Sequence, residues 1–115
     1  MVNNMKKYWD GENWLVVEKC KYMKKYYLGN KLHRKNGPAI IWYYKNRQIF
    51  KKIYFKNGKY HREDIPAIIH YDKNGNISEE RYYFNGNEIN QEDINFYFPV
   101  DSKEKKFLFN LKYGE

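Results

Sequence analysis

The sequence predicts an all-β fold, an antiparallel meander of stacked β-hairpin repeats that forms an elongated single sheet or a solenoid-like stack. Three observations carry this prediction. Aromatic residues make up 20 % of the 115 residues, and aromatic and β-branched residues favour strands. The motif NKLHRKNGPAII at 30–41 returns as GKYHREDIPAII at 58–69, 28 positions later. Turn sequences such as Asn57-Gly58 follow the apolar runs at regular intervals.

The repeat divides a single domain, 1–115, into four units. We expect a cap hairpin at 1–28, a first repeat at 29–56, a second at 57–84 and a degenerate cap repeat at 85–115. The third copy begins as YYFNGN and then loses the motif, as expected of a terminal repeat that caps a stack. The structural signature shared by the two central copies consists of His33, Arg34, Pro38, Ala39, His61, Arg62, Pro66 and Ala67.

Each central unit is predicted to be a β-hairpin. The short apolar runs AIIWYY at 39–44 and AIIHY at 67–71 lead into turn residues at 45–47 and 72–75. A second strand then runs to the next Asn-Gly pair, where asparagine and glycine accept the positive φ of a tight turn. Because proline has no N–H to donate to a neighbouring strand, the two signature prolines mark the starts or edges of strands.

Period-two alternation separates the two faces of the predicted sheet. The side that begins at Ala39 and Ala67 is apolar in both copies, so we expect it to face the core. The side that begins at Ile40 and Ile68 changes between the copies, which is typical of an exposed or ligand-facing surface. Helical periodicity is limited to a turn near 88–94.

The net charge of +8 hides an uneven distribution. Residues 1–60 contain 15 Lys and Arg against 3 Asp and Glu, a balance of +12, and residues 61–115 contain 7 against 11, a balance of −4. Such an asymmetry predicts a basic binding end and an acidic end, although a surface kept soluble by its lysines is the alternative explanation. Opposite charges at the two ends also permit head-to-tail contact between copies.

The composition also indicates the compartment. Cys20 is the single cysteine, so no intramolecular disulfide forms, and a free thiol fits a reducing environment. The N-terminus has no apolar run like that of a signal peptide. The longest apolar stretch, 39–44, is far shorter than the roughly 20 residues of a membrane-spanning helix. We therefore expect a soluble, cytoplasmic protein without a membrane contact.

The GxxHRxxGPA motif and its spacing resemble the MORN-repeat-variant proteins of bacteria and their phages, whose tandem units are close to YxNGKxHRxxGPAxxxxxxG. The resemblance covers roughly residues 26–87. It implies stacked β-hairpins, and some bacterial members are antitoxin-like. Two positions depart from the pattern, because Asn30 occupies the usual turn glycine and Ile65 stands where the first unit has Gly37. An isoleucine rarely adopts a left-handed conformation, so the connection does not require one there.

Metal binding by the repeated histidines is not expected. Equivalent residues of consecutive hairpins are two strands apart, about 9.5 Å at the usual strand spacing. Nitrogen ligands at about 2.0–2.1 Å from one zinc ion lie within about 4 Å of each other. His33 and His61 are therefore poorly placed to share an ion, and His70 has no cysteine near it in sequence. We predict neither a metal nor a cofactor.

Catalysis is not expected either. Serine occurs only at Ser78 and Ser102, threonine is absent, and neither serine has a nucleophile-like glycine context. A thiolate nucleophile would pair Cys20 with a histidine, but no neighbouring residue supports that arrangement. Carboxylates follow only the second His-Arg pair, at Glu63 and Asp64. The doublet is better explained as a scaffold element, in which a histidine N–H donates to a backbone carbonyl and an arginine bonds carbonyls or those carboxylates.

If the doublet is scaffold, function lies on the surface of the sheet. Basic and aromatic residues interleave in the N-terminal half. The sign of the charge also changes between copies, because Lys24 and Lys52 correspond to Glu80 in the next copy. The alternative is ordinary sheet surface, with lysine stems covering tyrosine rings. The predicted partner-binding residues are Lys19, Lys21, Lys24, Lys25, Lys51, Lys52, Tyr22, Tyr26, Trp42 and Tyr44.

Two classes of partner suit such a patch. An acidic protein surface would gain from complementary charge and aromatic anchors, and a nucleic acid would place phosphates on lysines and bases on rings. We expect a non-catalytic protein-binding module that inhibits another protein. The resemblance implies an antitoxin-like protein or a phage-encoded anti-defence protein, such as an anti-CRISPR-type blocker of a nucleoprotein complex in a bacterial cytoplasm. Nucleic-acid binding by the basic aromatic face is the alternative.

Overall fold

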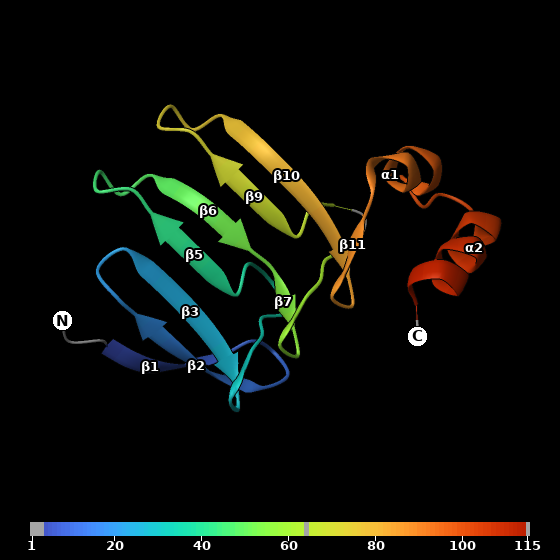
Figure 1. The fold of residues 1–115 in the computed structure, drawn as a ribbon. Coiled ribbons are helices and arrows are strands. Elements are labelled where there is room, and N and C mark those ends of the chain that lie inside the picture. The colour runs from blue at the N-terminus through green and yellow to red at the C-terminus, as the bar shows by residue number, and fades with distance from the viewer. Residues whose placement is uncertain (1–3, 64, 115) are drawn as a thin grey trace.

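The computed structural model describes residues 4–63 and 65–114 and confirms the predicted fold class, an open antiparallel meander (Figure 1). The main sheet has the strand order β1-β2-β3-β5-β6-β9-β10-β11, with β4 paired to β3, and β7 and β8 form a separate two-stranded hairpin. The strands are β1 (Asn4–Trp9), β2 (Trp14–Lys19), β3 (Met23–Leu28), β4 (Lys31–Leu32), β5 (Ile40–Tyr43), β6 (Ile49–Ile53), β7 (Phe55–Lys56), β8 (Lys59–Tyr60), β9 (Ile68–Tyr71), β10 (Ile77–Phe84) and β11 (Asn87–Ile89).

The hairpin turns follow the predicted repeat. The turn between β5 and β6 and the turn between β9 and β10 close with the same pair of backbone hydrogen bonds, at positions 28 residues apart. Arg47 and Gly75 hold equivalent places and both have positive φ, 74° and 87°. Glycine adopts this conformation without strain, whereas arginine does not. Arg47 offsets the cost in part because its Nη1 donates to the carbonyl of Lys21 at 2.6 Å.

The main hydrophobic row lies on the side that the sequence pattern indicated as variable. Ile40, Ile53 and Ile68 stand directly opposite one another on β5, β6 and β9 and form one buried cluster. We call this side the Ile40 face. Leu32 of β4 and Phe55 of β7 pack against the row, and a pattern within single strands does not reveal such long-range cover. The prediction of an exposed or ligand-facing surface is therefore wrong for the isoleucines of this side.

The opposite side of the sheet, which we call the Ile41 face, is also buried beside the row of isoleucines. Ala39 and Ala67 are fully buried, and Ile41 and Ile69 are also buried. A second cluster on this side, near the N-terminal edge, consists of Leu15, Val17 and Tyr26. The sheet is thus covered on both faces near its centre, and its solvent-facing side chains lie toward the hairpin turns and the two edges.

Two helices follow β11, namely α1 (Gln91–Tyr97), where the sequence indicated only a helical turn near 88–94, and α2 (Lys103–Tyr113), which it did not predict. Asn90 and Ser102 cap them, since each side-chain oxygen accepts a backbone N–H three residues later. Phe109 and Tyr113 of α2 pack on Ile89, at the end of the sheet where Figure 1 shows both helices. The expected degenerate cap repeat at 85–115 thus begins as a strand and continues as helices over its described part. Within 4–63 and 65–114 no helix is long and apolar enough to span a membrane.

The Ile40 face row makes a direct prediction about stability. Ile53 is buried in the middle of the row, so Ile53→Ala is expected to lower the free energy of unfolding by about 2–5 kcal/mol. Ile77 lies on β10 and is exposed, so Ile77→Ala is the matched control and should cost less than about 1 kcal/mol. Urea denaturation of both variants measures the difference, and equal midpoints would contradict the assignment of the core.

Candidate partner-binding surface and connection cleft

Each histidine of the signature accepts a hydrogen bond from the turn of the following unit. The backbone N–H of Asn57 donates to His33 Nδ1 at 3.0 Å, and that of Asn85 donates to His61 Nδ1 at 2.9 Å. Both asparagines have positive φ, 51° and 50°, and open an Asn-Gly turn. A ring nitrogen that accepts a hydrogen bond carries no proton, so each neutral ring holds its proton on Nε2. The histidines therefore tie consecutive units together.

Each arginine of the signature holds the start of the next strand in place. Arg34 Nη1 donates to the carbonyl of Pro38 at 3.3 Å, and Arg62 makes the equivalent bond at 3.2 Å. The guanidinium carbon of Arg34 also lies 3.9 Å from the ring centroid of Tyr26, and the corresponding distance in the second copy is 3.7 Å. A cation over an aromatic face is attracted to the ring, so the arginine joins the connection to the sheet.

These contacts give the His-Arg doublet a structural role but change one expected detail. The histidines were expected to donate to carbonyls, and instead they accept at Nδ1. The reason is that the Asn-Gly turn of the next unit leaves a backbone N–H without a strand partner. Among the described residues no ion pair joins Arg62 to Glu63, and Asp64 lies outside them.

Both signature connections line one cleft of about 800 Å³. Its lining contains the two histidines and two arginines of the signature together with Lys35 and Lys56, against the carboxylates Glu12 and Glu63. The spacing of the strands did not predict that both histidines line one cleft, because the cleft is formed by the connections and not by the strands. Over the parts of the chain that the structure describes, no group of three His, Cys, Asp or Glu side chains is arranged to hold a metal ion.

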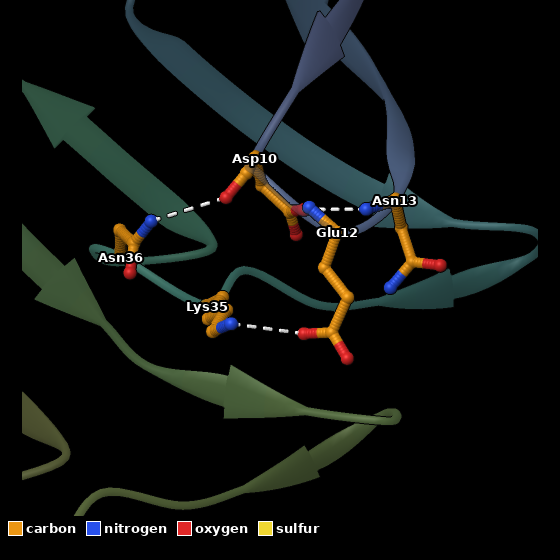
Figure 2. A network of polar contacts seen from close by, with 5 residues as sticks. All are labelled: Asp10, Glu12, Asn13, Lys35 and Asn36. Atoms are coloured by element: carbon orange, nitrogen blue, oxygen red, sulfur yellow. Dashed lines mark hydrogen bonds and ion pairs between the residues drawn. The ribbon is translucent and has the colours of Figure 1, made fainter.

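A polar network fixes one wall of this cleft to the N-terminal hairpin (Figure 2). Asp10 Oδ1 accepts the backbone N–H groups of Glu12 and Asn13, and its carbonyl accepts Asn36 Nδ2 at 3.2 Å. Lys35 pairs with Glu12 at 3.0 Å. The hydrogen bond from the Asn13 N–H, followed by that from Glu12, holds the pKa of Asp10 below its ordinary value despite the opposing effect of burial. The network thus locks the first turn onto the first connection.

The register divides the predicted partner-binding residues between the two faces. Lys25, Trp42 and Lys51 point to the Ile40 face, because Lys25 stands opposite Ile40 and Lys51 stands opposite Trp42. Met23, on the other side of Trp42, belongs to the same row. Trp42 is 37 % exposed. These four side chains form what we call the Trp42 patch.

The remaining predicted residues lie elsewhere. Lys24 and Lys52 stand opposite Ile41 and point to the Ile41 face, and Lys19 is in the same row. Tyr26 is on that face but buried, with the Lys24 ammonium 5.4 Å from its ring centroid. The other three lie in the turns outside the strands: Lys21, Tyr22 and Tyr44. Neighbouring lysines of one strand necessarily alternate between faces, so one continuous patch of all ten does not form.

The sequence-based selection missed several exposed apolar side chains. Trp9 and Trp14 stand opposite each other on β1 and β2, with ring centroids 5.3 Å apart, and both are exposed. Phe107 and Leu111 are exposed one turn apart on α2. The two tryptophans flank the Asp-Gly-Glu-Asn turn, which is a hairpin signal, so the pair was detectable from the sequence.

None of the family models, curated proteins and solved structures compared with the chain matches it. The resemblance to the MORN-repeat-variant proteins therefore rests on the residues of the repeat and on their spacing.

His61 is expected to make the protein less stable in mildly acidic solution. Burial, with a further contribution from the charge of Lys56, lowers the pKa of the His61 ring below its ordinary value of 6.5, against an opposing effect of Glu63. Well above pH 6.5 the ring is neutral in the folded and in the unfolded state, so its full contribution to the free energy of unfolding is present. As the pH falls below 6.5, the unfolded chain binds the proton first, so the free energy of unfolding decreases until the pH passes the folded-state pKa.

Urea denaturation between about pH 8 and about pH 5 measures this effect. The comparison protein is His61→Asn, whose side-chain oxygen can still accept the N–H of Asn85 but does not titrate in this range. The difference in unfolding free energy between the two proteins isolates His61, because every other titrating group is common to both. The expected result is a wild-type stability that falls more steeply toward low pH. Parallel pH profiles would contradict the role assigned to the ring.

Proposed function

We propose that the protein is a non-catalytic protein-binding module, an inhibitor that occupies an acidic surface of another protein or complex. One observation carries the proposal. An exposed tryptophan, Trp42, stands on the Ile40 face with Met23 and Lys51 directly opposite it and Lys25 on the diagonal. Tryptophan is the residue most typical of binding hot spots, and surrounding cations favour an acidic partner.

The charge distribution on the sheet supports binding at its basic end. Along the row of Trp42 the side chains change from Lys51 on β6 to His70 on β9 and Glu79 on β10. An acidic partner is therefore attracted to β3, β5 and β6 and repelled at β10. The gradient orients the partner on approach and makes association faster at low salt.

The signature side chains support a non-catalytic role. Both histidine Nδ1 atoms accept backbone N–H groups, and both arginines bond a proline carbonyl and lie over a tyrosine ring. A general base needs a ring nitrogen free to accept a substrate proton, and these rings have that nitrogen occupied. By resemblance of the repeat, we propose a neutraliser of a toxin or a phage-encoded blocker of a bacterial defence complex.

Charge reversal on one face tests the placement of the site. Lys25→Glu with Lys51→Glu should abolish capture of the partner from host lysate, because it reverses the charge beside Trp42. Lys24→Glu with Lys52→Glu is the matched control, since it makes the same charge change on the same two strands but on the Ile41 face. Quantitative mass spectrometry of the captured proteins is the measurement, with circular dichroism to verify the fold. Equal loss in both double variants would contradict the Trp42 patch.

Nucleic-acid binding is the second candidate function, and a row of lysines on the Ile41 face favours it. Lys19 stands opposite Lys24, and Lys24 and Lys52 stand on either side of Ile41. A row of ammonium groups across three strands suits phosphates. Two features weigh against it: Glu80 continues the row, and the ammonium groups of Lys24 and Lys52 already lie over tyrosine rings.

A labelled single-stranded oligonucleotide separates the two candidates. If the Ile41 face binds phosphates, fluorescence anisotropy should show binding at about 50 mM salt and a loss of at least about tenfold in affinity at about 200 mM. Lys24→Glu with Lys52→Glu should then remove binding, and Lys25→Glu with Lys51→Glu should retain most of it. No binding at the lower salt concentration rejects the nucleic-acid candidate.

A further inference from the structure

Over residues 4–63 and 65–114, both ends of the main sheet have a strand edge without a partner. Among these residues β1 pairs with β2 alone, so the outer edge of Asn4–Trp9 is free. β10 pairs with β9 on one side, but on the other side β11 reaches only Tyr82–Phe84. Within the described residues, the outer edge of β10 from Ile77 to Arg81 is therefore unpaired. Figure 1 shows β1 and this part of β10 on opposite sides of the sheet.

The two free edges have opposite charge. β1 contains Lys6 and Lys7, which are both exposed, and the free part of β10 contains the exposed Glu79 and Glu80. Arg81, at the end of this part, is paired with Glu88 at 2.8 Å. Glu79 Oε1 lies 3.9 Å from His70 Nδ1, and its charge also acts on the Arg81 guanidinium of the same strand. Edge lysines normally prevent one strand from pairing with another of its kind. Here the same lysines would favour an edge that contains glutamates.

The strand pairing places the opposite charges of the two edges on both faces of the sheet. Lys6 stands opposite Val17, which places it on the Ile41 face, and Lys7 is on the Ile40 face. Glu80 stands opposite Ile69 on the Ile41 face, and Glu79 stands opposite His70 on the Ile40 face. Each edge thus has one charge on each face. Whatever the direction of the added strand, each face of the joined sheet contains a lysine from one copy and a glutamate from the other.

We propose that the protein associates head to tail with a second copy of itself, the β1 edge of one copy extending the sheet of the other at β10. Exposed apolar side chains on the same edges, Met5 on β1 and Ile77 on β10, add contact area. Symmetric pairing of two β1 edges or two β10 edges would oppose like charges, which disfavours a closed dimer. Head-to-tail contact is heterologous, so it repeats along an open chain of copies.

This association is independent of the proposed function, because the Trp42 patch lies on β3, β5 and β6 and not on either edge. Its strength depends on surface charge, and salt screens charges on the surface. Species larger than a monomer are therefore expected to increase with protein concentration and to disappear at high salt. A failure of partner capture would leave the expected self-association unchanged. A failure of self-association would likewise leave the proposed partner binding unchanged.

Sedimentation velocity of the full chain at about 0.01 M and about 1 M salt provides the first measurement. Two variants sharpen it: Lys6→Glu with Lys7→Glu makes both edges acidic, and Glu79→Lys with Glu80→Lys makes both basic. Each variant alone should remain monomeric at low salt, and an equimolar mixture should associate again, because every acidic edge then finds a basic one. Restored association in the mixture also demonstrates that both variants are folded.

Lys24→Glu with Lys52→Glu is the control for charge alone, since it alters interior strands and should associate as the wild type does. A wild-type monomer at both salt concentrations overturns the proposal and leaves the edges to a strand of a different protein. Association of either single-sign variant as strong as that of the wild type overturns it as well. An equimolar mixture of the two variants that stays monomeric also overturns the proposal.

Discussion

The rest of the structure depends on one hydrogen bond, from the backbone N–H of a turn asparagine to the Nδ1 atom of the histidine 24 positions before it. The turn asparagine lies outside the paired residues of its own hairpin, so no strand partner satisfies its N–H, and leaving it unpaired would cost free energy. The preceding unit provides the acceptor. A unit is therefore incomplete without its neighbour, which fixes the order and period of the repeat. The adjacent arginine extends the link, because it bonds the carbonyl of the proline from which the next strand begins.

This dependence explains why the two outer units keep different parts of the motif. The last unit keeps its turn, since Asn85 must donate to His61, but residues 85–115 do not contain the His-Arg pair. Two helices cover Ile89 instead of a further hairpin. The position 24 residues before the first of these turns holds Met5 and not a histidine, so Gly29 has no equivalent acceptor there. That turn is free to differ, and it has Gly29 in the positive-φ position with Asn30 after it, where the two later copies have Asn-Gly.

The sequence predicts the parts of this fold that local chemistry determines. Asn-Gly pairs, β-branched runs and the 28-residue period were sufficient for the strands and turns of the two central copies. The burial of the Ile41 face was predictable from the apolar pattern. That of the Ile40 row was not, because Leu32 and Phe55 reach it only after the connections fold. Helix α2 was missed because only Phe109 and Tyr113 are buried, while Phe107 and Leu111 face outward and blur the periodicity. For the candidate site, the sequence predicted which basic and aromatic residues to consider. How neighbouring lysines divide between the two faces could be read only from the pairing register of the strands.

The charge changes sign between copies at strand positions that are not part of the repeated structural signature. Positions 24, 52 and 80 share one row on the Ile41 face and read Lys, Lys, Glu, while positions 51 and 79 share one on the Ile40 face and read Lys, Glu. Both faces therefore become more acidic in the same direction, toward β10. A gradient along the axis of the sheet, unlike a patch on one face, gives complementary ends as well as a basic surface. The proposed partner site on β3, β5 and β6 and the proposed extension at β1 and β10 use different strands, so neither requires the surface of the other.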